Sequence, residues 1–379
     1  MSSELVHTPE GVRDIYGDEY AKKLRVEGLM LEKARSYGYE DIQTPTFEFF
    51  DVFSKEIGTT PSRELYKFFD KEGNTLVLRP DFTPSIARCA AKYFADCNRP
   101  IRFCYIGNTF TNNSNLQGKL KETTQMGAEL IGDPSVKADG EMAAMIIESL
   151  LFAGLKDFQL SVGNVEYFKG ICAEAGLDEK TELELREFIS GKNYFGAEEL
   201  LIEKKIEKQY RDALLRLTDL FGSCDALGQA KALVHNRRSL NAVKRLEELY
   251  QVLCCYGAEK YVSFDLGMLS KYHYYTDMIW KAYTYGVGDA IVKGGRYDTL
   301  LDHFGKKAPA VGFVVGIDDL IAALDRQGIE TVIPSKAEII GYTPDTFPKM
   351  LEKAREIRAK GGKAALTPLG NIEGRTGTE

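Results

Sequence analysis

Two polar side chains, Gln125 and Glu129, lie on a segment that otherwise has the composition of a core strand. Residues two apart in a strand point to the same face, so residues 125, 127 and 129 are expected to share one face of the strand Thr123–Ile131. Burying an amide and a carboxylate costs free energy unless polar groups meet them. The pattern therefore predicts a polar ligand site. The alternative is a half-exposed strand whose polar face is solvated.

A second pair with chemical potential is Asp81 and Thr83, in the segment Arg79-Pro80-Asp81-Phe82-Thr83-Pro84. The two prolines keep this backbone out of a helix and stiffen it. A carboxylate and a hydroxyl on such a loop could bind an amine. Alternatively, either side chain could cap the helix predicted at Ser85–Phe94. The two roles are compatible.

Regular elements are expected to position these residues. Arg102–Ile106 alternates aromatic and β-branched residues, which predicts a strand, and an Asn-, Ser- and Thr-rich loop, Asn108–Gly118, connects it to the return strand. Helical spacing, strand patterns and stop signals predict the following further elements: helix Asp18–Tyr37, strand Tyr39–Thr44, hairpin strands Leu65–Phe69 and Thr75–Leu78, helix Gly140–Ala153 and strand Phe158–Val162.

In the second half of the chain the sequence pattern changes from strands to helices and then back to strands. Apolar residues recur at helical spacing through Leu183–Ser190, Ala197–Phe221 and Ala226–Leu253, which predicts a helical insertion. Strands are expected at Tyr261–Leu266, Met278–Tyr285, Ile291–Lys293 and Ala310–Gly316, and a short βαβ unit after Pro334. The expected organisation is a core formed by residues 1–164 and 261–330, an insertion at 165–260 and a short α/β segment at 331–379.

The composition is that of an ordinary soluble globular protein. Of the 379 residues, 44% are hydrophobic and 28% charged, and the net charge is −7. A mildly acidic chain is a poor candidate for a nucleic-acid-binding protein. No run of 18 apolar residues predicts a membrane span, and the first residues lack the apolar segment of a signal peptide. A cytoplasmic protein without membrane contact is expected.

Metal and cofactor chemistry find no support in the sequence. The seven cysteines form no CxxC pair and the four histidines are scattered, so free thiols and no metal site are expected. Neither GxGxxG nor GxxxxGK[ST] occurs, which argues against these two phosphate-binding loops. No cofactor is expected.

The ordered set of motifs resembles the class II aminoacyl-tRNA synthetase core, and specifically histidyl-tRNA synthetase, over roughly residues 7 to 325. The motifs that carry the resemblance are TPEGVRD, LRPDFT, YIGNTF, QMGAE, YYT and GGRYD followed by AVGF. It implies an α+β fold with a mixed, mainly antiparallel sheet flanked by helices. It also implies a homodimer that pairs through the Tyr39–Phe53 region.

Three positions depart from the synthetase pattern. In the synthetases, three arginines hold the ATP α-phosphate, assist adenylate formation and hold the γ-phosphate. The matching positions here are Thr111, Ser270 and Asp319. Adenylyl transfer depends on cations that offset developing negative charge, and loss of one such group costs a few kcal/mol. Loss of all three, one to an acid, predicts that aminoacylation is absent. No tRNA partner is expected.

The positions that match the amino-acid-binding residues of the synthetases are mostly retained. The resemblance implies histidine contacts at the following positions: Asp81, Thr83, Gln125, Glu129, Tyr274 and Tyr275. Glu129 can accept a hydrogen bond from an imidazole N–H. Asp81 stands where the synthetases have Glu and is one methylene shorter. The C-terminal segment is a fragment of the anticodon-binding domain that the synthetases carry.

A kept amino-acid pocket beside a dismantled nucleotide site resembles the family of ATP phosphoribosyltransferase regulatory subunits. The resemblance implies a non-catalytic chain that activates the short-form catalytic subunit at the first step of histidine biosynthesis and transmits feedback inhibition by histidine. It also implies a hetero-oligomer, often an octamer. The alternatives are a working histidyl-tRNA synthetase, against which Thr111, Ser270 and Asp319 argue, and a stand-alone histidine sensor.

Overall fold

The computed structural model describes residues 6–53, 60–113, 120–270 and 275–369. The chain divides into two compact units, Met1–Thr331 and Val332–Glu379. The first unit holds every described residue of the predicted pocket.

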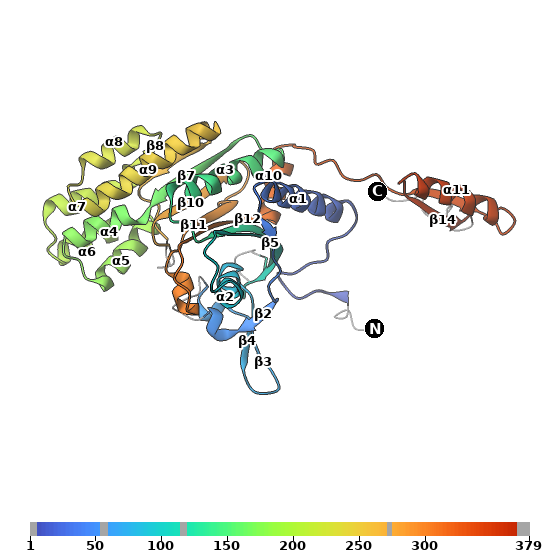
Figure 1. Cartoon of the computed structure of the whole chain (residues 1–379), viewed down its shortest axis with the longest axis horizontal. Coiled ribbons are helices and arrows are strands. Elements are labelled where there is room, and N and C mark those ends of the chain that lie inside the picture. Colours follow the sequence, from blue (N-terminus) through green and yellow to red (C-terminus); the bar gives the residue numbers. More distant parts are fainter. Residues whose placement is uncertain (1–5, 54–59, 114–119, 271–274, 370–379) are drawn as a thin grey trace. The chain divides into compact units, whose positions relative to one another are not determined.

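A nine-stranded, mainly antiparallel sheet forms the centre of the first unit (Figure 1). Only the pairings β1 with β5 and β7 with β9 are parallel among its described strands. In spatial order the strands are β1 (Glu40–Asp41), β5 (Ile101–Phe110), β6 (Glu122–Ile131), β12 (Ala310–Gly316), β11 (Val292–Arg296), β10 (Met278–Thr284), β7 (Phe158–Asn164), β9 (Val262–Asp265) and β8 (Phe221–Gly222).

One face of this sheet carries the main apolar core. Met126, Ala128 and Leu130 of β6 point into it and are almost fully buried. The helices that pack there are α1 (Gly17–Ser36), α3 (Val136–Phe152) and α10 (Ile317–Arg326). Because side chains alternate along a strand, the intervening residues of β6, Gln125 and Glu129 among them, face the opposite side.

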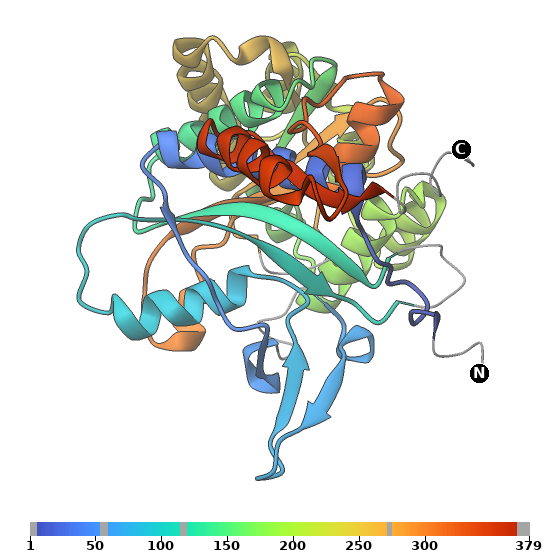
Figure 2. The same cartoon turned by 90° about the vertical axis from the view of Figure 1, so that its right-hand side faces the viewer.

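The opposite face is covered by shorter elements. Helix α2 (Thr83–Tyr93) and the 3₁₀ segment η7 (Leu300–Phe304) form a second, smaller apolar cluster there, which includes Phe82 and Tyr105. A small antiparallel sheet, with the order β2, β4, β3, lies on this side of the molecule (Figure 2). The remaining elements of this region are β2 (Phe47–Phe49), η2 (Phe50–Phe53), η3 (Ser62–Glu64), β3 (Lys67–Phe69) and β4 (Thr75–Leu78).

The insertion is helical, and its helices pack on α3 and β7 as part of the main core. It consists of α4 (Val165–Glu174), α5 (Glu179–Ser190), α6 (Tyr194–Glu203), α7 (Lys208–Leu215), η5 (Arg216–Asp219), the edge strand β8, α8 (Asp225–Ala232), α9 (Arg237–Tyr256) and η6 (Glu259–Tyr261). Helix α9 begins at an N-cap, Asn236, whose side chain accepts the N–H of Ser239.

The second unit is a single βαβ motif. Strands β13 (Glu338–Tyr342) and β14 (Ala364–Pro368) are parallel and flank helix α11 (Phe347–Ala359). Among the described residues of the whole chain, no helix is long and apolar enough to span a membrane.

The predicted fold class is confirmed, and several predicted boundaries are wrong. The stretches Ala197–Phe221 and Ala226–Leu253 are each broken into two helices. The first break follows α6, where Lys205 has a positive φ, and the second precedes the Asn236 cap. Strand β1 covers only Glu40–Asp41 of the predicted Tyr39–Thr44, and β5 continues to Phe110 into the predicted loop.

Candidate functional site

On the face of the sheet opposite the main core, glycines occupy paired positions of the central strands. Gly312 of β12 is paired with Glu129 of β6 on one side and with Gly295 of β11 on the other. A β-carbon at residue 312 would overlap the Glu129 carboxylate, and one at residue 295 would press on the ring of Tyr275. These glycines therefore leave the space in which the polar side chains of the site lie.

Glu129 is the centre of the site and is only 1% exposed. Thr83 at the start of α2 donates its hydroxyl to Oε1 over 2.7 Å, and Tyr297, just after β11, donates its hydroxyl to Oε2. Burial raises the pKa of Glu129 to about 8, although both hydrogen bonds act to lower it. With a pKa of about 8, the Glu129 carboxyl group is close to the point at which its neutral and ionised forms are equally populated at physiological pH.

Two further polar atoms on this face make no hydrogen bond to the part of the chain that the structure describes. Among the described residues, the Tyr105 hydroxyl and Oε1 of Gln125 are buried without a hydrogen bond. The Tyr105 hydroxyl lies over Gly127, between Gln125 and Glu129 on β6. Buried polar atoms normally find partners, so unpartnered ones in a row are a mark of a ligand site. The row offers hydrogen-bonding groups along about 13 Å of strand.

Asp81 and Tyr275 complete the described surroundings. The Asp81 carboxylate accepts the backbone N–H of Thr83 over 3.2 Å, and its negative charge helps to raise the pKa of Glu129. Burial, together with the charges of Asp81 and Glu129, raises the pKa of Tyr275. Helix α2 begins at Thr83 rather than at the predicted Ser85, so Asp81 both binds the first turn and faces the pocket.

The structure brings together most of the residues that the sequence singled out. Asp81, Thr83 and Tyr275 lie near Glu129, Gln125 lies further along β6, and Tyr274 falls outside the described residues. Sequence reasoning missed Tyr105 and Tyr297. Both belong to motifs that were recognised, YIGNTF and GGRYD, but their roles depend on which residues of neighbouring strands face them.

A cavity of about 420 Å³ adjoins the site and is lined in part by Gln125. Thr111 and Asp319, two of the positions that hold arginines in the synthetases, both line it. Three carboxylates line it as well, those of Asp289, Asp318 and Asp319. Among its described lining residues the one cation is Lys293, which pairs with Asp289 over 2.8 Å. Such a lining repels phosphates.

Ser270, the third substituted position, lies just before a segment outside the described residues and is itself 8% exposed. A serine hydroxyl cannot supply the fixed positive charge of a guanidinium. The described residues also contain no group of three or more His, Cys, Asp or Glu that could hold a metal ion.

The fold and the site define a protein of the histidyl-tRNA synthetase class. The family model described as histidyl-tRNA synthetase matches residues 11–320. The crystal structure of histidyl-tRNA synthetase from Nostoc sp. PCC 7120 shares the fold, with a TM-score of 0.81 at 21% identity, over 97% of this chain and 88% of that one.

Within that class, the more similar relatives carry a different description. ATP phosphoribosyltransferase regulatory subunits of Ruminiclostridium cellulolyticum and Clostridium kluyveri are 42% and 37% identical, over 94% and 97% of this chain and 85% and 94% of theirs. A Bacillus halodurans structure titled ATP phosphoribosyltransferase regulatory subunit/histidyl-tRNA synthetase has a TM-score of 0.89 at 34% identity, over 97% of this chain and 93% of that one. The chain belongs to the family of ATP phosphoribosyltransferase regulatory subunits.

Proposed function

We propose that the chain binds histidine in the pocket around Glu129 and, as a regulatory subunit, passes the effect of this binding to a catalytic subunit. The partner is the short-form ATP phosphoribosyltransferase, which the chain activates in the absence of histidine and inhibits in its presence. The regulatory role agrees with the names of the relatives. Activation, feedback inhibition and the identity of the effector are inferred from the site.

The observation that carries the proposal is the row of buried polar atoms on β6 and its neighbours. Glu129 stands at one end with two hydroxyl donors, and the unpartnered Gln125 and Tyr105 atoms follow along the row. A carboxyl group whose pKa is about 8 can exchange a proton with an imidazole, whose own pKa is near 6.5. A ligand with an imidazole at one end and an amine at the other fits this order of groups.

The neighbouring cavity supports a binding role without adenylation. Its described lining has three carboxylates and one lysine, which is paired with Asp289, so these residues do not offset the charge of a triphosphate. A pocket that binds the amino acid but not the nucleotide can serve as a sensor. To act on a partner, histidine must favour one state of the assembly over another, because equal affinity for both states shifts nothing.

We further propose that the chain forms a homodimer and that homodimers combine with catalytic subunits into a hetero-octamer. The homodimer surface is the exposed aromatic part of the Tyr39–Phe53 region. Phe47 and Phe49 of β2 are 51% and 56% exposed, which is unusual for two phenylalanines on one strand.

The deciding experiment reconstitutes the complex with the short-form catalytic subunit and measures its activity with increasing histidine. Calorimetry on this chain alone then asks whether it binds histidine by itself. The expected result is histidine binding to the isolated chain and inhibition of the complex over a related concentration range. Inhibition of the complex without histidine binding to this chain would move the effector site to the partner and overturn the proposal.

A further inference from the structure

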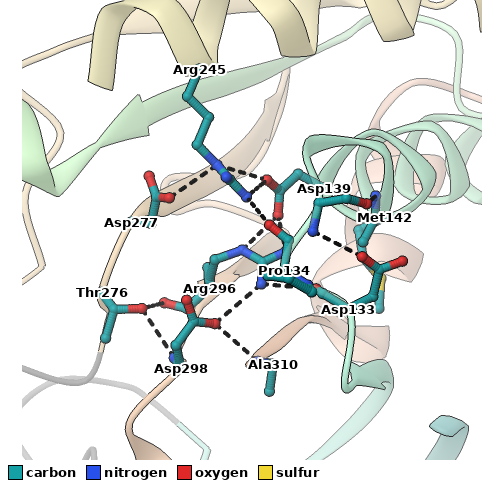
Figure 3. Close-up of polar contacts among 12 residues, drawn as sticks. Asp133, Pro134, Asp139, Met142, Arg245, Thr276, Asp277, Arg296, Asp298 and Ala310 are labelled. Carbon is teal, nitrogen blue, oxygen red and sulfur yellow. Dashed lines mark hydrogen bonds and ion pairs between the residues drawn. The ribbon is translucent and has the colours of Figure 1, made fainter. Parts of the chain in front are cut away.

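A buried ion-pair network connects the insertion to the sheet (Figure 3). Arg245 of α9 donates to Asp139 of α3 over 2.5 Å, and Arg296 of β11 donates to the other oxygen of the same carboxylate over 2.6 Å. The side chains of Asp139 and Arg296 are 0% and 1% exposed. Asp139 is therefore shared between one guanidinium from the insertion and one from the central sheet.

The first branch of this network leads to one pocket tyrosine. Nε of Arg245 lies 3.0 Å from Oδ2 of Asp277, and Asn164 at the end of β7 donates to the other Asp277 oxygen. The preceding residue, Thr276, donates its backbone N–H to the carbonyl of Arg296 over 2.8 Å. Tyr275, which packs over Gly295, comes directly before these two anchored residues.

The second branch leads to the other pocket tyrosine. Arg296 is held by Asp139, by the carbonyl of Asp133 at 3.1 Å and by Asp298 at 3.1 Å. Tyr297 stands between Arg296 and Asp298 in the chain and donates its hydroxyl to Glu129. The orientation of the Tyr297 side chain toward Glu129 thus depends on Arg296 and Asp298, the two charged residues that flank it.

Arg245 is the member that the insertion contributes to this network. Its guanidinium also donates to the carbonyl of Pro134 over 2.9 Å, so that it spans α3, the segment before α3 and the segment before β10. Removal of one partner from a buried ion pair leaves an uncompensated charge, which is strongly unfavourable. A displacement of α9 that breaks these contacts must therefore disturb Asp277 and Asp139 together.

Another arginine on the same helix makes an ion pair that stays within the insertion. Arg238 makes a two-pronged ion pair with Glu166 of α4, at 2.6 and 2.8 Å, and both partners belong to the insertion. Arg245 lies two helical turns further along α9 and reaches out of the insertion instead. The insertion does not require a contact with residues outside it, such as those that Arg245 makes, for its own stability.

We infer that Arg245 is a positioning residue for the ligand pocket: through Asp277 and Asp139 it fixes Tyr275 and Tyr297, and it thereby couples the placement of α9 to occupancy of the site around Glu129. The inference deepens the proposed function and rests on it, because the ligand is taken to be histidine. Ligand binding then stiffens α9, and a partner that shifts α9 changes the affinity of the pocket. Networks of this kind change coupling by about 2- to 30-fold in binding.

The test uses the full chain and L-histidine as the probe. Calorimetry compares the wild type with Arg245→Met, Arg245→Lys and the matched control Arg238→Met. We expect Arg245→Met to weaken histidine binding by about 10-fold, within the range expected for coupling networks. Arg245→Lys should recover part of the affinity, because a lysine can pair with one carboxylate but not with both. Arg238→Met should bind like the wild type.

Hydrogen exchange separates positioning from mere stabilisation. In the wild type, histidine should slow the exchange of amides in α9, and in Arg245→Met this protection should disappear although histidine still saturates the pocket at high concentration. Emission of Trp280, the single tryptophan, which is fully buried on β10, checks that each variant keeps the sheet intact. If Arg245→Met does not fold, Asp277→Asn carries the test, since it removes the ion pair between Arg245 and residue 277 and leaves the pair between Arg245 and Asp139 in place.

The outcomes are distinct. The inference is overturned if the wild type binds histidine and Arg245→Met keeps both the wild-type affinity and the protection of α9. The same result in Asp277→Asn overturns it where that variant carries the test. In either case the proposed function stands. Equal losses in Arg245→Met and Arg238→Met also overturn the inference, because they show general destabilisation of α9. Absence of histidine binding to the wild type overturns the proposed function and this inference together.

Discussion

Gly312 lies directly across from Glu129 on the neighbouring strand, so close that a β-carbon at residue 312 would coincide with the carboxylate. The carboxylate lies over the glycine, and Thr83 and Tyr297 each donate a hydroxyl to one of its two oxygens. The position of the central acid of the pocket is thus set by the absence of a side chain on β12.

Gly312→Ala should remove histidine binding while leaving the chain folded. The added methyl group displaces the Glu129 carboxylate from both hydroxyl donors, and we expect affinity to fall at least about 10-fold, the loss of roughly one charged hydrogen bond. Calorimetry measures the affinity for histidine. Gly228→Ala in α8 is the control, because a β-carbon there meets nothing within 4 Å and alanine favours a helix. Wild-type affinity in Gly312→Ala would contradict the placement of Glu129 in the site.

The raised pKa of Glu129 predicts a specific pH dependence of stability. An unfolded chain releases this proton near pH 4.5 and the folded chain near pH 8, so folding takes up a proton between these values. The contribution of Glu129 to stability is complete below pH 4.5 and is lost as the pH rises toward 8, by at most about 1.4 kcal/mol per unit. Glu129→Gln, which cannot ionise, should not show this loss.

Urea unfolding of both chains from pH 5 to pH 8 measures the difference. The free energy of unfolding of the wild type should fall relative to that of Glu129→Gln across this window. Parallel curves would show that Glu129 is ionised in the folded chain throughout, and that its environment is more polar than the structure indicates.

The sequence predicts which candidate residues lie near one another better than it predicts where the elements begin and end. Period-two alternation places Gln125 and Glu129 on one face, and the structure has them there. The two prolines, Pro80 and Pro84, predict that Asp81 and Thr83 lie in a stiff segment before a helix. The exact start of α2 at Thr83 is not predictable, because Pro84 is compatible both with a first helical turn and with a loop before it.

Residues that reach the site from other strands are beyond prediction from one sequence. Tyr297 meets Glu129 because β11, β12 and β6 are neighbours in a fixed register, and register is a tertiary property. The same holds for Arg245, which is one of many charged residues on an amphipathic helix and differs from Arg238 only in what it reaches. Local patterns carry no information about such partners.

The exposed aromatic face of the small sheet should pair two copies of the chain. Phe47 contacts Phe68 edge to face, with ring centroids 5.7 Å apart, and Phe49, two residues further along β2, lies on the same face. Phe49→Glu places a charge in this apolar surface and should convert a dimer into a 42.4 kDa monomer, measured by light scattering at micromolar concentration.

Tyr285→Glu is the matched control, because Tyr285 is an aromatic residue that is 77% exposed on the turn after β10. It should remain dimeric. A wild-type chain that scatters as a monomer would refute the dimer, and a dimeric Phe49→Glu would place the interface elsewhere.

Histidine-dependent exchange of labelled pyrophosphate into ATP should be absent. Adenylate formation needs cations at the phosphates, and Thr111 and Asp319 line a cavity in which three carboxylates stand instead. An authentic histidyl-tRNA synthetase assayed beside the chain provides the positive control. Exchange well above background would show that other groups replace the three arginines, and the assignment of a purely regulatory role would fail.

Glu129→Gln should separate feedback from activation. The glutamine has the same shape, and its amide can still accept from one hydroxyl while the other hydroxyl turns to accept from the amide NH₂, so the surroundings of Thr83 and Tyr297 persist. What is lost is the charge that an imidazole or ammonium group would meet. A charged hydrogen bond contributes about 1.5–3 kcal/mol, so histidine binding should weaken about 10- to 100-fold.

The concentration of histidine that inhibits the reconstituted complex should rise by the same factor, because the two affinities are linked through one site. Uninhibited activity should stay near that of the parent complex, since Glu129 is buried and contributes nothing to an external surface. Glu122→Gln, at the other end of β6, controls for the loss of a carboxylate on this strand. If the Glu129→Gln complex is inhibited by histidine like its parent, inhibition acts through another site, on the catalytic subunit or between the chains, and the pocket is an inherited remnant of the synthetase fold.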